Sequence, residues 1–165
     1  WAADRPAEAL DRARAVVAQA ARGDLQVSHG TIRWAWPLAS RSARALADSA
    51  ASAELVTSLD AHPIGHLAPI LRAERQLARA CAKAEAGDQD ADAAFTGAVV
   101  ALRRVASPYH LAHGLLDHAS YLAHSGDTGA CTAAVAEARE IGLRLSCPPL
   151  VERADRLAKE LVSST

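Results

Sequence analysis

The chain has 165 residues, of which 50% are apolar but only 4% aromatic, and alanine alone makes up about a quarter of it. Alanine has the highest helix propensity and strand formers are scarce, so the composition favours an all-α fold and excludes an all-β one. Eighteen Lys and Arg against 19 Asp and Glu leave a net charge of −1, which argues against nucleic-acid binding. No apolar run nears the roughly 20 residues of a membrane helix.

Helix-breaking residues recur along the chain and divide it into about eight helical segments of roughly 12 to 22 residues. We expect the first helix near Pro6 to Arg22, a kink at Pro37 in the second segment, and a helix end at Gly142. No domain linker interrupts residues 1–165, which we interpret as one excised piece of a longer protein. The breakers are Pro6, Gly23-Asp24, Asp48-Ser49, His62-Pro63, Gly87-Asp88, Ser107-Pro108, Gly126-Asp127 and Cys147-Pro148-Pro149.

An internal repeat is the most informative feature of the sequence. The turns Gly87-Asp88 and Gly126-Asp127 lie 39 residues apart, and each precedes a helix with a small, a large and a small residue in order. We predict clearer repeats at 66–106 and 107–145, irregular repeats at 1–65 around a further turn at Gly23-Asp24, and a C-terminal capping helix at 146–163. The packing residues after the two turns are Ala91, Phe95 and Ala98, then Cys131, Val135 and Ala138.

The unit from Ser107 to about Leu145 resembles the tetratricopeptide repeat. Leu115, Ala119 and Leu122 stand where that family usually has Trp, Gly and Tyr. The resemblance implies a right-handed α-solenoid of antiparallel helix pairs, in which the first helix of each pair lines a concave groove. It further implies that His113, Ser120 and His124 face that groove, whereas the Lys/Asn set that binds a peptide carboxylate in chaperone-binding members is absent.

A narrower resemblance covers about Ala50 to Leu161. The motifs 71–73, 93–95, 107–109, 115–119 and 151–154 look like the helical tail of large bacterial signalling ATPases, of the LuxR/maltose-regulator or cyclase-like type. The chain contains no P-loop, cyclase motif or DNA-reading helix-turn-helix, so we expect no enzyme activity and no cofactor. The resemblance implies a cytoplasmic sensor or interaction tail, whose partner is a protein, a peptide, another domain of the parent chain or a second copy.

Histidines cluster on one side of the helix that follows Pro108. His110, His113 and Asp117 are spaced i, i+3 and i+7, and His124 follows seven residues later, so these side chains share one face. We interpret that face mainly as solvated; groove binding, or a weak zinc or nickel site at His110, His113 and Asp117, are the alternatives. His118 falls beside the apolar stripe and is expected to pack.

Trp34 and Trp36 supply the alternative function, a small-molecule effector domain. One of them is expected in the core, and a pocket could be lined by both together with His113 and His124. The three cysteines, Cys81, Cys131 and Cys147, are interpreted as small core residues of a protein in a reducing compartment.

Overall fold

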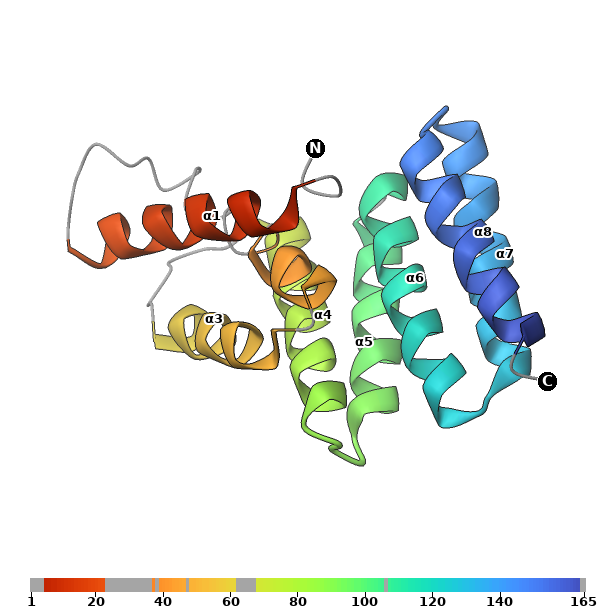
Figure 1. Cartoon of the computed structure of the whole chain (residues 1–165), viewed down its shortest axis with the longest axis horizontal. Helices are drawn as coiled ribbons and strands as arrows, with labels where there is room; N and C mark the ends of the chain where they lie inside the picture. The colour runs from red at the N-terminus through yellow and green to blue at the C-terminus, as the bar shows by residue number, and fades with distance from the viewer. Residues whose placement is uncertain are drawn as a thin grey trace. The chain divides into compact units, whose positions relative to one another are not determined.

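Helices supply all the regular secondary structure in the residues that the computed structural model describes, which are 5–22, 37, 39–46, 48–61, 68–105 and 107–163. The predicted all-α class is confirmed for this part of the chain. Residues 39–45 form a helical segment, called segment 39–45 below. The helices with defined bounds (Figure 1) are α1 Pro6–Ala21, α3 Ser49–Ala61, α4 Pro69–Glu85, α5 Ala91–Arg104, α6 Pro108–Ser125, α7 Thr128–Arg144 and α8 Pro148–Ser163.

Proline begins α1, α4, α6 and α8, at Pro6, Pro69, Pro108 and Pro148. The first helical position suits proline because its fixed φ is already helical and no intrahelical acceptor waits for its missing N–H. These four helices therefore begin with the same local signal.

The first of two compact units covers Trp1–Ala82. Its helices α1 and α3 and segment 39–45 share an apolar cluster in which alanine is the commonest residue. Arg14 of α1 also pairs with Glu54 of α3 at 2.9 Å. Small side chains let these helices approach closely. The cluster consists of Leu10, Ala13, Val17, Ala39, Ala43, Ala51 and Leu55.

The second unit covers Lys83–Thr165 and contains α5 to α8. Each of these helices packs against the next and runs antiparallel to it, and α6 also contacts α8 (Figure 1). Phe95 of α5 is 2% exposed and packs its ring on His118 of α6, with ring centroids 5.2 Å apart. Arg103 of α5 pairs with Glu137 of α7, and Arg139 of α7 with Asp155 of α8 at 2.7 Å.

Gly142 does not end α7, contrary to the sequence prediction. The helix continues to Arg144, and Gly142 is buried where α7 meets the start of α8. A Cβ built there would lie 3.1 Å from Val151 Cγ2 and 3.2 Å from Leu150 Cβ. The glycine is therefore explained by close helix packing, and the chain turns instead at Ser146, whose φ is 49°.

Candidate interaction site

The same turn geometry occurs at three aspartates. The backbone N–H of Asp127 donates to Leu122 O at 3.0 Å, that of Asp88 to Lys83 O at 2.9 Å, and that of Asp48 to Ala43 O at 2.9 Å. Each bond reaches back five residues, which is the pattern that closes a helix before a left-handed residue. The three aspartates are 40 (48 to 88) and 39 (88 to 127) residues apart.

Each of these aspartates also accepts a hydrogen bond from the backbone after it. Asp127 Oδ1 accepts from Ala130 N at 2.9 Å, and Asp48 Oδ1 accepts from Ala51 N at 2.9 Å, so both cap the next helix. Asp88 Oδ1 accepts from Asp90 N at 2.8 Å. The glycines before Asp88 and Asp127 have φ of 69° and 85°, which explains their residue type.

The turn at Asp48 was not predicted as a repeat. Alanine stands at position 47, where the other two turns have glycine, and the sequence reasoning placed a third turn at Gly23-Asp24, which lies outside the described residues. The signal that could have found it is the aspartate spacing together with the small and large pair Ala51 and Leu55. Both are buried and follow Asp48 as Ala91 and Phe95 follow Asp88.

All nine residues predicted to pack the repeats are buried. Cys131 shows why small residues are needed, because its thiol donates to Ala119 O across α6 and α7 at 3.2 Å. Burial raises the pKa of the Cys131 thiol, so it is a packing residue and a poor nucleophile. The nine are Ala91, Phe95, Ala98, Leu115, Ala119, Leu122, Cys131, Val135 and Ala138.

The histidine face of α6 is not the solvated surface that we predicted. His113 and Asp117 are buried, at 8% and 6% exposure. Asp117 is bonded by Arg153 of α8 at 2.6 Å, and the His113 ring lies 4.8 Å from that of Tyr109. The prediction was wrong here because α6 is covered by α8 as well as by its neighbours in sequence.

The remaining positions on that face are more accessible. Ser120 is half-buried and donates to Leu116 O at 3.1 Å. His124 is exposed, with its Nδ1 2.7 Å from Ser120 O. His113 and His124 are about 16 Å apart along one helix, so these two imidazoles do not line a common pocket. Trp34 and Trp36, the other predicted pocket residues, lie outside the described residues.

The suggested metal site at His110, His113 and Asp117 finds no support in the geometry. No group of three or more His, Cys, Asp or Glu side chains among the described residues is arranged to hold a metal ion. His110 instead meets the Tyr109 ring edge-on at 5.5 Å. His118 packs as predicted, stacked on Phe95 and 3.0 Å from an Asp92 carboxylate oxygen.

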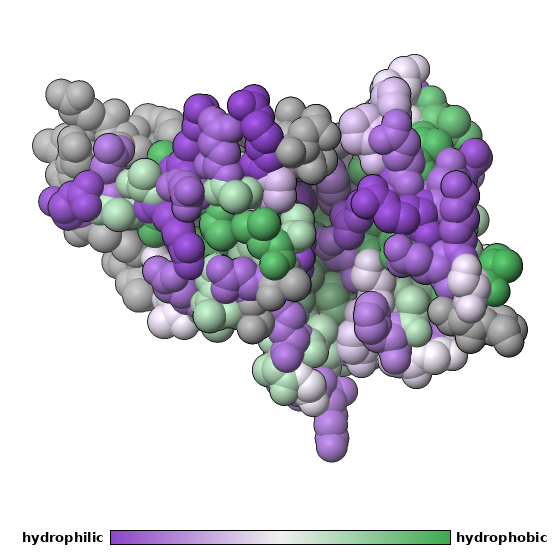
Figure 2. All heavy atoms as spheres, in the orientation of Figure 1, coloured by the Kyte–Doolittle hydropathy of each residue, from purple (hydrophilic) through white to green (hydrophobic). Residues whose placement is uncertain are grey.

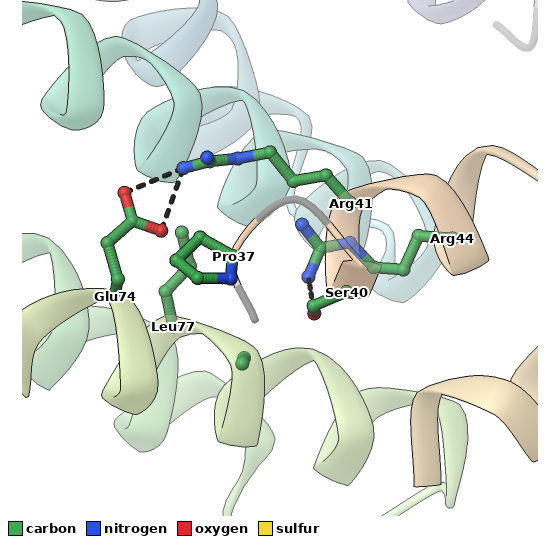
Figure 3. A pocket seen from close by; sticks show the side chains of 7 residues that line it. Pro37, Ser40, Arg41, Arg44, Glu74 and Leu77 are labelled. Atoms are coloured by element: carbon green, nitrogen blue, oxygen red, sulfur yellow. Dashed lines mark hydrogen bonds and ion pairs between the residues drawn. The ribbon is translucent and has the colours of Figure 1, made fainter. Parts of the chain in front are cut away.

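The repeat register relates the predicted groove positions to a crevice in the first unit. Counted back from Asp127, Asp88 and Asp48, Leu116 corresponds to Leu77 and Pro37, and Ser120 corresponds to Cys81 and Arg41. By the same count His113 corresponds to Glu74. A narrow crevice between segment 39–45 and α4 is lined by Pro37, Ser40, Arg41, Arg44, Glu74, Leu77 and Ala78 (Figure 3).

An ion pair closes this crevice. One terminal nitrogen of Arg41 donates to both carboxylate oxygens of Glu74, at 2.7 and 2.8 Å. The two side chains are 12% and 3% exposed, respectively. Arg44 Nη1 donates to Ser40 Oγ at 3.3 Å, and the space left between the lining residues has no room for a water molecule. The crevice is a polar seam between two helices and not an open pocket.

The chain was compared with protein-family models, with curated proteins and with solved structures. None of the three comparisons found a match. Among the described helices, none is long and apolar enough to cross a membrane.

Sequence reasoning missed Arg41, Arg44 and Glu74. An arginine in an Ala-rich helical stretch is ordinarily a solvated surface residue. Nothing in the local sequence distinguishes Arg41 and Arg44 from the chain's other arginines. The signal that could have found them is the register itself. Once Asp48 is recognised as a turn equivalent to Asp127, Arg41 falls at the position of Ser120, which was already a groove candidate.

Proposed function

We propose that the chain is a non-enzymatic interaction module built of tetratricopeptide-like helix pairs, serving as the sensor or regulatory tail of a larger bacterial regulator. In this proposal the pairs stack as a right-handed α-solenoid. The first helix of each pair lines the binding groove, and α8 is the C-terminal capping helix.

The observation that carries the proposal is the turn repeated at Asp48, Asp88 and Asp127. Equivalent turns at spacings of 40 and 39 residues, each with equivalent packing behind it, are typical of a helical repeat. A single amphipathic helix pair cannot bury its apolar stripe alone, so repeats stack and leave one extended surface for a partner.

The outer surface of α8 supports its role as a cap. Only Leu150 and Ala154 of this helix are fully buried. Figure 2 shows hydrophilic side chains over α8, and the exposed charged residues there include Glu152, Arg156 and Lys159. A polar outer face is what the last helix of a stack needs, since no further repeat covers it.

Site-specific photocrosslinking tests the proposal. A photoreactive amino acid replaces His124, which is exposed on the groove side of α6, in the full chain, and the protein is irradiated in an extract of the cells that encode it. The matched control carries the same group at Ala133, which is exposed on α7. We expect a discrete crosslinked partner from position 124 and none from position 133. No product, or the same products from both positions, would overturn the proposal.

A further inference from the structure

The turn between α7 and α8 repeats the geometry of the turns at Gly87 and Gly126, but with a different residue. The backbone N–H of Cys147 donates to Gly142 O at 2.9 Å, five residues back, as do the residues that follow Gly87 and Gly126. Ser146 therefore stands where those two turns have glycine, and its φ is 49°. Among the described residues it is the one residue other than glycine with a positive φ.

A side chain at this position strains the closed turn. The left-handed region disfavours an L-residue that has a Cβ by roughly a factor of ten. Such strain persists only where the surrounding contacts impose it, and it is relieved when the segment extends. Extension is also favoured at Cys147, because the residue before a proline, here Pro148, prefers the β region. Residues 145–147 are therefore held bent by the packing of α8 and not by their own preference.

The side chains that anchor α8 lie in its first half, and both of its fully buried residues are there. Arg153 donates to Asp117 of α6 at 2.6 Å, and Arg139 of α7 donates to Asp155 at 2.7 Å. None of these contacts requires α8 to belong to the same chain as α6 and α7. When residues 145–147 extend, the α8 of a second copy can make all of them, and the strain at the turn is removed.

Two leucines beside the turn are exposed. Leu143 is 54% and Leu145 is 42% exposed, although both side chains are large and apolar. Exchange of α8 brings two copies together at the turn, because each chain crosses to the other there and a two-fold dimer joins the same patch of both copies. The leucines of each copy then cover those of the other. Arg144 and Glu140, the charged residues next to them in α7, lie 4.0 Å apart and balance each other.

We propose that two copies of the chain form a dimer by exchanging α8, with residues 145–147 as the hinge. Each α8 packs on α6 and α7 of the other copy through the contacts that it makes within one chain in the closed form (Figure 1). Monomer and dimer therefore have the same helices and the same contacts of α8, and they differ at the hinge. The inference goes beyond the proposed function and does not depend on it.

Engineered cysteines distinguish exchange from simple association. In the Cys147→Ala background, Arg139→Cys and Asp155→Cys place thiols at a contact between α7 and α8 that exists in both forms. Cys81 and Cys131 are buried, which protects them from the reagent. The full chain is incubated at high concentration just below its melting temperature, and monomer and dimer are separated by size-exclusion chromatography with light scattering. Each fraction is treated with a short bis-maleimide and run on a denaturing gel. We expect covalent dimers from the dimer fraction and internally linked monomers from the monomer fraction.

Variants of the hinge residue test the role of strain. Ser146→Gly relieves the closed turn, so the Kd of the dimer, measured by analytical ultracentrifugation, should rise about tenfold for each of the two hinges. Ser146→Val increases the strain, because a β-branched residue is poorly tolerated at positive φ, and the Kd should fall. Ser163→Gly, the same change at the exposed end of α8, should leave the Kd unchanged. Circular dichroism confirms that each variant is folded.

Three results would overturn the proposal. The first is a parent chain that stays monomeric at the highest concentration at which it is soluble. The second is a dimer fraction in which the bis-maleimide gives only internally linked monomers, because that result indicates association without exchange. The third is a Ser146→Gly variant that dimerises as tightly as the parent, which would show that strain at the hinge does not favour the dimer.

Discussion

Replacing Gly126 by alanine should destabilise the chain, although the added methyl group meets nothing. A Cβ at this position has no neighbour within 4 Å, but the backbone φ is 85°. An L-residue in the left-handed region costs about 1–2 kcal/mol. Against this, alanine lowers the entropy of the unfolded chain, which is worth about 0.4–1 kcal/mol. We therefore expect a net loss of about 1 kcal/mol in the free energy of unfolding.

The same substitution at two other glycines separates backbone conformation from packing. Gly97 is exposed within α5 and its Cβ would also meet nothing, so Gly97→Ala should stabilise the chain by about 0.5–1 kcal/mol. At Gly142 the Cβ would lie 3.1 Å from Val151 Cγ2 and 3.3 Å from Val151 N, and backbone cannot move aside as a side chain can. Gly142→Ala should therefore cost about 1–3 kcal/mol.

Urea unfolding followed by far-UV circular dichroism measures all three effects in the same chain. A thermal melt gives a second measurement, because a change of about 1 kcal/mol in the free energy of unfolding shifts Tm by roughly 2–4 °C for a protein of this size. The order of stability should be Gly97→Ala above the parent, with Gly126→Ala and Gly142→Ala below it. A Gly126→Ala variant as stable as the parent would refute the left-handed turn on which the repeat register depends.

Two further predictions concern α7. Arg103 holds the pKa of Glu137 below its usual value, with a smaller contribution from Arg144. The pair therefore stabilises the fold fully above the unfolded pKa of about 4.5, and the stabilisation is lost as the pH falls through the folded pKa. Glu137→Gln should therefore be less stable than the parent at pH 7 by about 0.5 kcal/mol, a small effect because the pair is partly exposed. The urea midpoints of the variant and the parent should converge toward pH 3. A difference between the two midpoints that stays constant with pH would contradict this prediction. Iodoacetamide should alkylate the half-buried Cys147 well before Cys131, whose burial raises its pKa, and peptide mass spectrometry showing equal rates would contradict the packing of α6 on α7.

The sequence predicted best those features that depend on one helix and its sequence neighbour. Phe95 and Val135 are buried as expected. In a helical hairpin, a large apolar side chain between two small residues packs against the neighbouring helix, because the small residues let that helix approach closely. Gly142 shows the limit of such reasoning. Near the end of a helix a glycine is commonly a stop signal, and only the approach of α8 reveals that this one serves close packing.

The errors on α6 have a common physical cause. The spacing of His113 and Asp117 correctly places them on one face, away from the leucine stripe, but it cannot say whether another helix covers that face. The covering contact comes from Arg153, 36 residues after Asp117 in the chain. A polar face in a helical stack is therefore ambiguous from sequence alone, because charged residues that pair between helices have the same spacing as those that face water.

The same ambiguity explains why the sequence did not reveal the crevice between segment 39–45 and α4. The predicted groove positions of α6 carry His113 and Ser120, and their equivalents by sequence register carry Glu74 and Arg41, so equivalent positions differ in chemistry. A pair of opposite charges in adjacent helices can lock to each other, as Arg41 and Glu74 do, whereas the histidines of α6 have no such mutual attraction.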